Sequence, residues 1–219
     1  ALIARLFDSY DDKLFMNRTL KYVGAMHTDY SHYNLELLKN WGITLTNVPG
    51  YCTESVAELT ISALLNISRK THDGMNFVKQ GNWGFEMFMG WELKGKTLGI
   101  IGLGKIGSRV AEIAGSLGMN VIYYSPHKKI NSKAKYFGLD ELVSRSDVIS
   151  LHCALSDETK NLLSRNRLSL MKNGAVLLDS ARSELVDLDA VCEMCSKGRI
   201  YAWFEEAERS VDVRRQRPV

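Results

Sequence analysis

The sequence predicts an α/β protein built on a doubly wound parallel sheet. Three observations lead to this prediction. Apolar, strand-like runs alternate with helical patterns along most of the 219 residues. The links between these elements are short, as is typical of parallel α/β units. Near the middle of the chain, a glycine-rich turn joins a buried strand at residues 98–101 to a helix.

The N-terminal part of the chain has the pattern of a small parallel α/β unit. Strands are expected at residues 1–4, 20–25 and 43–46, and a helix is expected at 33–41, closed by Gly42. The chain opens directly on a strand, which is unusual for a domain. We therefore expect that an N-terminal segment is missing.

Residues 53–69 carry the longest helical pattern. Its polar residues form one stripe and nearly all the others are apolar, so we expect most of its circumference to be buried at a junction between domains or subunits. The stripe consists of Glu58, Ser62, Asn66 and Arg69. Residues 73–91 are rich in Gly, Met and aromatic side chains and are predicted to form an irregular arm.

The glycine-rich turn has the spacing G-x-G-x-x-G. Gly102 permits a sharp turn, Gly104 lets the backbone approach a pyrophosphate, and Gly107 lets helix and strand pack closely. A helix at 108–117 would point its free N–H groups at the phosphates, and a strand at 121–124 completes a βαβ unit. This context favours a dinucleotide site over a plain strand–turn–helix. The predicted lining is Gly102, Leu103, Gly104, Lys105, Ile106 and Gly107.

The remaining chain continues the alternation. Helices are expected at 138–142, at 165–171 with Ser164 as N-cap, and up to residue 196 with Asp187 or Asp189 as N-cap. Ligands in such folds lie at the carboxyl ends of the strands. The strands are expected at 148–151, 175–178 and 200–204.

Composition bounds the class of protein. Hydrophobic residues make up 45% and charged residues 24%, as in soluble globular proteins, and the net charge of +3 is too small to favour nucleic acid or an anionic membrane as partner. No signal peptide or membrane-spanning run is visible. The four cysteines lack disulfide-framework spacing, which favours a reducing cytoplasm. Cys192 and Cys195 form a C-x-x-C on an amphipathic helix, where buried thiols are favoured over a metal or redox site.

With these motifs placed, the sequence resembles the D-isomer-specific 2-hydroxyacid dehydrogenases over almost everything before Phe204. The pieces that carry the resemblance, besides the glycine turn, are NVPG at 47–50, SVAELT at 55–60, GNW at 81–83, ELKGKTLG at 92–99, LH at 151–152 through ET at 158–159, SAR at 180–182 and LVD at 185–187. Each piece is short, but their order along the chain is specific.

The resemblance implies a Rossmann domain inserted in a flavodoxin-like substrate domain, which is only partial in this chain. The expected domains are a partial substrate-binding domain with an interdomain helix and arm at 1–92, a dinucleotide-binding domain at 93–206 and a divergent basic tail at 207–219. The implied reaction is reversible hydride transfer between a 2-oxo acid and a D-2-hydroxy acid with NAD or NADP. We also expect a homodimer.

Several site residues are carried over by the resemblance. Arg182, at the end of a central strand, matches the family's substrate-binding arginine, whose planar fork can hold a carboxylate at two points. The expected cofactor contacts beyond the glycine turn are His152, Cys153, Ala154, Ser180, Ala181 and Glu206.

Ser125 stands where NAD-specific sites carry an acidic residue that binds the ribose hydroxyls. A serine removes the charge that would repel a 2′-phosphate, and His127 and Lys128 supply positive partners. We therefore favour NADP over NAD. A solvated basic turn without cofactor preference is the alternative.

Two departures from the family pattern affect the expected activity. The family's catalytic acid is a histidine after the last Rossmann strand, and this sequence has none beyond His152. Asp29 also stands where the family often has a glycine-containing loop for the substrate carboxylate, so the identity of the substrate stays open. His27 beside it is expected to be solvated, with contact to the substrate as the alternative. We therefore predict a chain truncated at both ends and inactive by itself. The alternatives are a non-catalytic dinucleotide-binding regulatory module and a degenerate fragment of the family.

Overall fold

A computed structural model describes residues 1–4, 19–28, 30, 33–129 and 132–205. The chain divides into two compact units, residues 1–53 and 54–219, and each is described by itself. This division groups the long helix and the segment after it with the second unit. The domain limits at residues 92 and 206 stay predictions.

The first unit is a three-stranded parallel sheet with one helix. The strand order is β1-β2-β3, and helix α2 follows β2 in the chain. Its core contains Ala4, Val23, Leu38 and Ile43. The bounds are β1 Leu2–Ala4, β2 Tyr22–Ala25, α2 Leu35–Asn40 and β3 Thr44–Thr46. The small parallel α/β arrangement predicted for this part of the chain is thus confirmed.

The second unit contains a six-stranded sheet in which every neighbouring pair is parallel. The order is β6-β5-β4-β7-β8-β9, so the chain leaves β4 first to one side and then to the other. This is the Rossmann order, with its switch point between β4 and β7. The strands are β4 Thr97–Ile101, β5 Asn120–Tyr124, β6 Lys135–Tyr136, β7 Val148–Leu151, β8 Ala175–Asp179 and β9 Ile200–Phe204. The predicted doubly wound sheet is confirmed, and only the short β6 was not expected.

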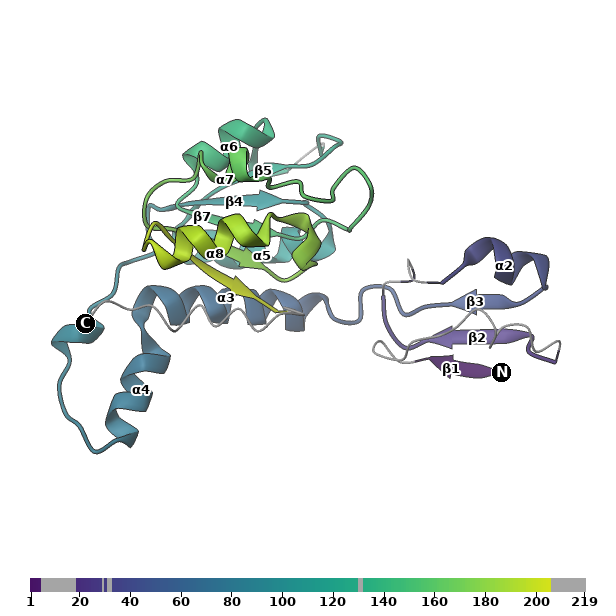
Figure 1. Cartoon of the computed structure of the whole chain (residues 1–219), viewed down its shortest axis with the longest axis horizontal. Helices are drawn as coiled ribbons and strands as arrows, with labels where there is room; N and C mark the ends of the chain where they lie inside the picture. Colours follow the sequence, from purple (N-terminus) through teal and green to yellow (C-terminus); the bar gives the residue numbers. More distant parts are fainter. Residues whose placement is uncertain (5–18, 29, 31–32, 130–131, 206–219) are drawn as a thin grey trace. The chain divides into compact units, whose positions relative to one another are not determined.

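Helices cover both faces of this sheet (Figure 1). One core cluster joins the strands to α3 and α5 through residues such as Leu64, Leu98 and Val110. A second joins them to α6, α7 and α8 through residues such as Leu142 and Leu177. The helices are α3 Thr53–Arg69, α5 Lys105–Ser116, α6 Leu139–Arg145, α7 Arg165–Leu168 and α8 Leu188–Ser196. Because successive strand residues point to opposite faces, burial on both faces explains the continuous apolar runs.

Helix α3 has the predicted limits, and its expected burial at a junction between domains or subunits stays a prediction. The predicted polar stripe is exposed, and Leu59 and Leu65 beside it are 41% and 37% exposed. An apolar pattern gives the face that a helix can bury, whereas the neighbours available in this chain decide how much of that face is covered.

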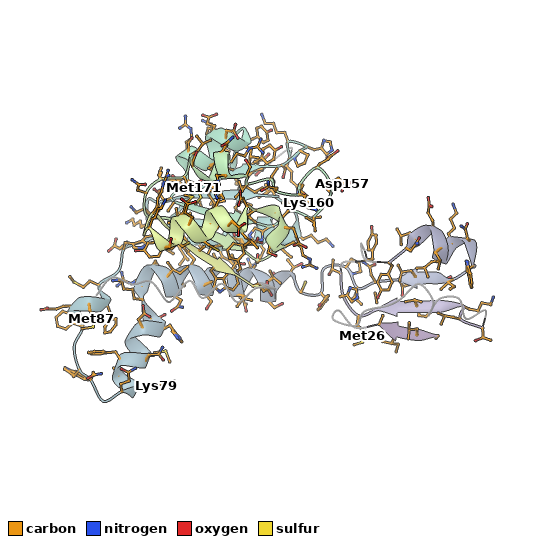
Figure 2. All side chains as sticks on the ribbon, in the orientation of Figure 1. Met26, Lys79, Met87, Asp157, Lys160 and Met171 are labelled. Carbon is orange, nitrogen blue, oxygen red and sulfur yellow. The ribbon has the colours of Figure 1, made fainter. Side chains whose placement is uncertain are left out.

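The irregular arm predicted for residues 73–91 is wrong in part. Helix α4, Thr71–Lys79, occupies its first half, and a short 3₁₀ helix, η1 Glu86–Phe88, follows. Lys70 separates α3 from α4, because its φ of 53° is not helical. The Asn66 side chain then accepts a hydrogen bond from the His72 amide at 2.8 Å. A side chain of α3, that of Asn66, therefore caps the N-terminus of α4. Lys79 and Met87 are labelled on this segment in Figure 2.

Several other helix limits also differ from the prediction, and α6, for example, ends at Arg145 and not at residue 142. Helix α5 begins at Lys105, because Gly104 with its extended backbone already acts as N-cap. Helix α7 ends at Leu168, three residues before the predicted limit. Of the helices that the structure describes, none has the length and apolar character to cross a membrane.

Candidate functional site

The glycine turn lies at the carboxyl end of β4. Gly102 has a φ of +95°, and its N–H donates to the Tyr124 carbonyl oxygen at 2.9 Å. A Cβ at Gly102 would lie 2.6 Å from the backbone nitrogen of Cys153, so the turn passes directly against the loop after β7. A Cβ at Gly107 would lie against the Gly102 carbonyl oxygen. Both positions are therefore closed to other residues by backbone atoms.

Gly104 is the N-cap of α5 and lies in a different environment. A Cβ placed there meets no atom of the described residues within 4 Å, so it would project into open space among them. Within the described part of the chain, no side chain caps this helix of 12 residues. Its first amides, including those of Lys105 and Ile106, have no acceptor inside the helix. Open space before uncapped amides fits a pyrophosphate, which such helix ends attract by hydrogen bonding and by the dipole.

Ser125 ends up beside this turn. Its hydroxyl oxygen accepts a hydrogen bond from the Leu103 amide at 3.0 Å, and both residues are buried. A hydroxyl that accepts one bond still has a proton to donate. His127 and Lys128 are exposed, and Lys128 Nζ lies 5.7 Å from the centre of the Tyr136 ring. The predicted ribose-binding residues are therefore gathered at the end of β5.

The ends of β7 and β8 are joined by a hydrogen-bonded imidazole. His152 Nε2 lies 2.8 Å from the Ser150 hydroxyl, and His152 Nδ1 lies 3.1 Å from the Ser180 hydroxyl. His152 is partly exposed as a residue, but burial of its imidazole lowers the pKa to about 4. The ring is therefore neutral near pH 7 and bonds one serine as donor and the other as acceptor.

Cys153 and Ala154 continue the loop after β7. Burial, followed by the charge of Asp179, raises the pKa of the Cys153 thiol to about 11. This thiol is therefore protonated and unreactive at neutral pH. Ala154 is exposed, and its carbonyl oxygen accepts from the Thr159 hydroxyl at 2.7 Å. Asp157 and Lys160 are labelled on this loop in Figure 2.

The loop after β8 carries Arg182. Its Nη1 donates to the Ala181 carbonyl oxygen at 2.9 Å, and the residue is half-buried. The Ala181 amide in turn donates to Asp179 Oδ1 at 2.9 Å. Burial raises the pKa of the Asp179 carboxyl to about 7. Asp179 is not among the predicted site residues, although an acid that ends an otherwise apolar buried strand is a usable signal.

The predicted residues thus form two neighbouring groups. Gly102, Gly104 and Ser125 surround the N-terminus of α5, while His152, Ser180, Ala181 and Arg182 lie at the ends of β7 and β8. The contact of Gly102 with the His152–Cys153 peptide links them. Glu206 lies outside the described residues. The roles of these residues stay predictions.

Two other residues of interest lie elsewhere. His27, in the first unit, was expected to be solvated, and this is wrong. It is 2% exposed and stacks on Tyr33 with ring centres 6.1 Å apart, so ring packing removes it from water. On α8, Cys192 and Cys195 are free, partly buried thiols, and burial raises the pKa of Cys195 to about 11.

Comparison with known proteins gives consistent matches. The family described as "D-isomer specific 2-hydroxyacid dehydrogenase, NAD binding domain" matches residues 61–209. The glyoxylate reductase of Aeropyrum pernix is 38% identical over 92% of this chain and 64% of its own length. This chain therefore spans less than two thirds of that relative.

Two solved structures resemble the chain closely. The D-lactate dehydrogenase of Aquifex aeolicus, complexed with NAD and lactic acid, has a TM-score of 0.83 at 34% identity and is matched over 93% of this chain and 64% of its own. An acyclic imino acid reductase in complex with NADPH and D-Arg has a TM-score of 0.85 at 30% identity, over 97% of this chain and 70% of its own. The matched family covers most of this chain, including the glycine turn and the ends of β7 and β8. The chain therefore belongs to the D-isomer-specific 2-hydroxyacid dehydrogenase family, by way of its NAD-binding domain.

Proposed function

We propose that this chain carries the cofactor-binding and carboxylate-binding part of an NAD(P)-dependent dehydrogenase that interconverts a 2-oxo acid and a D-2-hydroxy acid. The observation that carries the proposal is the open N-terminus of α5 at Gly104, which no side chain of the described residues caps. Helix α5 follows β4 and the loop that holds Arg182 follows β8, and only β7 lies between these two strands. The N-terminus of α5 can bind a dinucleotide, and the Arg182 guanidinium can bind a carboxylate. The bound nicotinamide supplies or accepts the hydride.

The two groups of residues divide the binding between them. Amides of the turn from Gly102 to Gly107 hold the pyrophosphate. The ends of β7 and β8, with His152, Cys153, Ala154, Ser180 and Ala181, lie across the switch point and line the other half of the cofactor. The neutral imidazole of His152, fixed by two serines, keeps these strand ends in register without adding charge.

Arg182 binds the substrate carboxylate. A half-buried guanidinium at the carboxyl end of a central strand offers a planar pair of donors, and one of its nitrogens is already oriented by the Ala181 carbonyl oxygen. The nature of the relatives supports a small 2-oxo acid as the substrate class, since a glyoxylate reductase and a D-lactate dehydrogenase are among them.

Turnover also requires a proton donor for the carbonyl oxygen. No histidine follows His152 in the 219 residues, and His152 itself is neutral with both ring nitrogens engaged. We therefore propose that this chain binds the cofactor and does not turn over substrate. The same observation favours the alternative of a non-catalytic dinucleotide-binding module.

The cofactor is NADP in preference to NAD. Ser125 adds no charge beside the turn and keeps a proton to donate, while exposed His127 and Lys128 provide a basic edge for a 2′-phosphate. Among the relatives, one structure is a complex with NADPH and another is a complex with NAD. Relatives of this family thus accommodate both cofactors.

The protein forms a homodimer in a reducing compartment such as the cytoplasm. The segment from α4 to η1 exposes large apolar side chains, including Trp83 at 93% and Phe85 at 75%. A cavity of about 560 Å³, lined in part by Leu59, Met75 and Trp203, lies beside α3 and α4. Exposed apolar surface of this kind is typical of subunit contacts. The four cysteines, which are thiols, support a reducing environment.

One experiment separates these functions. NADPH and NADH are titrated into the whole chain by calorimetry, and the reduction of glyoxylate, pyruvate and hydroxypyruvate is assayed with the same preparation. We expect saturable cofactor binding with negligible reduction of any of the three. Vigorous reduction would show that another residue serves as acid, whereas absence of cofactor binding would contradict the proposed function altogether.

A further inference from the structure

The carboxyl group of Asp179 is an incompletely satisfied buried acid. Asp179 is the last residue of β8 and is 2% exposed. Its Oδ1 accepts the Ala181 amide, but its buried Oδ2 has no hydrogen-bond partner among the residues that the structure describes. A buried carboxylate needs partners on both oxygens to offset lost hydration, so this site disfavours the charged form.

Ala181 joins this carboxyl group to the guanidinium of Arg182. The Ala181 N–H donates to Asp179 Oδ1 at 2.9 Å, and the Ala181 carbonyl oxygen accepts from Arg182 Nη1, also at 2.9 Å. The position of the guanidinium and the state of the carboxyl group are therefore coupled through one residue. The charge of Arg182 also acts directly on the carboxyl group, whose pKa it lowers.

Near pH 7, Asp179 is the group that changes its charge, because the pKa values of His152 and Cys153 beside it lie far from 7. Burial and, to a smaller extent, Glu184 raise its pKa to about 7, although the amides of Ala181 and Arg182 lower it. From β7, the imidazole of His152 has a pKa of about 4 and the Cys153 thiol one of about 11. Directly after β9, the Glu205 amide donates to the Asp179 carbonyl oxygen at 2.9 Å.

We propose that Asp179 is a positioning residue that controls how strongly Arg182 holds the carboxylate of a monoanionic 2-oxo acid. When the Asp179 carboxyl is neutral, it carries no charge that competes with the substrate anion for the guanidinium. When it is ionised, its negative charge competes for the guanidinium and repels the anion. This inference rests on the proposed role of Arg182.

Thermodynamic linkage makes the effect reciprocal, since a bound anion must favour the protonated form of Asp179 to the same extent. Affinity for the anion therefore falls as pH rises through 7.

The test uses oxamate, a monoanion that resembles pyruvate but is not reduced. It is titrated into the whole chain in saturating NADPH at pH 5.5 to 8.5 and constant ionic strength. For the wild-type chain we expect Kd to rise roughly tenfold across this range, the ratio that corresponds to one pKa unit. Asp179→Asn, which keeps an oxygen for the Ala181 amide, should bind oxamate tightly at every pH.

Asp147→Asn is the matched control. Asp147 precedes β7 at the opposite edge of the sheet, where its Oδ2 accepts the Thr97 amide and its Oδ1 pairs with Lys172. The same chemical change there should leave the pH dependence intact. A pH-independent wild-type Kd, or a pH dependence that survives in Asp179→Asn, would overturn the inference.

Arg182→Gln separates a failure of the proposed carboxylate site from a failure of its control by Asp179. If this variant binds oxamate as the wild type does, or if the wild type binds none, the proposed carboxylate site itself is wrong. If Asp179→Asn fails to fold, carboxyl-labelled aspartate in the wild-type chain gives the answer by NMR. A signal with a midpoint near 7 that moves upward with oxamate supports the inference, and a midpoint near 4 contradicts it.

Discussion

His152 and Asp179 lie at the ends of adjacent strands and have pKa shifts of opposite direction. Burial lowers the pKa of His152 from 6.5 to about 4 and raises that of Asp179 from 3.8 to about 7. Both shifts have the same physical origin, because burial favours the neutral form of either group. Between β7 and β8, the carboxyl edge of the sheet therefore carries an imidazole that is neutral near pH 7 and a carboxyl group that titrates near pH 7.

These shifts predict an unusual dependence of stability on pH. Between pH 4 and 6.5 the unfolded chain binds a proton at His152 that the folded chain does not, so His152 makes the free energy of unfolding rise with pH. Between about pH 3.8 and 7 the folded chain keeps a proton at Asp179 that the unfolded chain has lost. Asp179 therefore makes the free energy of unfolding fall with pH. Each slope is at most about 1.4 kcal/mol per pH unit, and the two offset each other in the wild type.

Asp179→Asn removes the contribution of Asp179 to the pH dependence of the free energy of unfolding and leaves that of His152. We expect the free energy of unfolding of this variant, relative to the wild type, to increase steadily from pH 4 to 7 and then level off. Denaturant unfolding at half-unit pH steps measures this difference. A difference that stays constant across that range would show that Asp179 titrates normally in the folded chain.

The basis of cofactor choice is also a single-residue question. Ser125→Asp keeps an acceptor for the Leu103 amide but places a negative charge where a 2′-phosphate would lie. We expect NADP to bind at least about tenfold more weakly and NAD to bind better, which fluorescence titration of both cofactors would detect. Ser164→Asp, at the N-cap of α7, introduces the same charge elsewhere and should change neither affinity. If NAD binds the wild type more tightly than NADP, and Ser125→Asp leaves this unchanged, Ser125 does not recognise the ribose.

At the scale of elements, the strands were predictable and the arm was not. Buried strands such as β4 and β7 have uninterrupted apolar runs, and burial on both faces requires such runs. Helix α4 has no buried residue, contains Gly74 and begins after a residue with positive φ. Its start depends on the Asn66 side chain from the preceding helix, a contact that no local propensity encodes.

Asn66→Ala tests this account of α4. The Asn66 side-chain oxygen accepts from the His72 amide and from the Thr71 hydroxyl, so its loss leaves the first turn of α4 without a cap. We expect amides within residues 71–79 to exchange with solvent several-fold faster, equivalent to about 1 kcal/mol of local stability. Lys79→Ala, at the exposed end of the same helix, should have little effect. Unchanged exchange rates in Asn66→Ala would show that α4 is held by other contacts.

At the scale of the whole molecule, the order of motifs was sufficient to predict the Rossmann sheet and the family. It was insufficient to find Asp179, because the missing partner of Oδ2 depends on what β7, β9 and the loop after β8 bring around it. The same limit applied to His27, whose burial depends on stacking against Tyr33. Sequence patterns indicate which face is apolar, whereas the hydrogen-bond partners of a buried polar group are set by packing.

Assembly is the second property at this scale. Trp83 is 93% exposed, so Trp83→Glu should leave the folded unit intact and weaken a dimer that buries this side chain. We expect sedimentation equilibrium to show a dimer for the wild type and a weaker dimer or a monomer for Trp83→Glu. Tyr201→Glu, at an exposed aromatic residue of β9, is the control. A monomeric wild type would contradict the proposed assembly.

The central claim is that the N-terminus of α5 holds the pyrophosphate of a nicotinamide dinucleotide. Gly104→Val tests it most directly, because Gly104 has a backbone that any residue can adopt and a Cβ there meets only open space. Gly115→Val is the matched control in the same helix, since its Cβ also meets no atom within 4 Å.

Calorimetric titration of NADPH and NADH into both variants, beside their free energies of unfolding, is the deciding measurement. We expect the free energy of unfolding of Gly104→Val to lie within about 0.5 kcal/mol of the wild-type value. This variant should bind neither cofactor measurably, while Gly115→Val should bind both normally. Unchanged cofactor affinity in a folded Gly104→Val chain would contradict it.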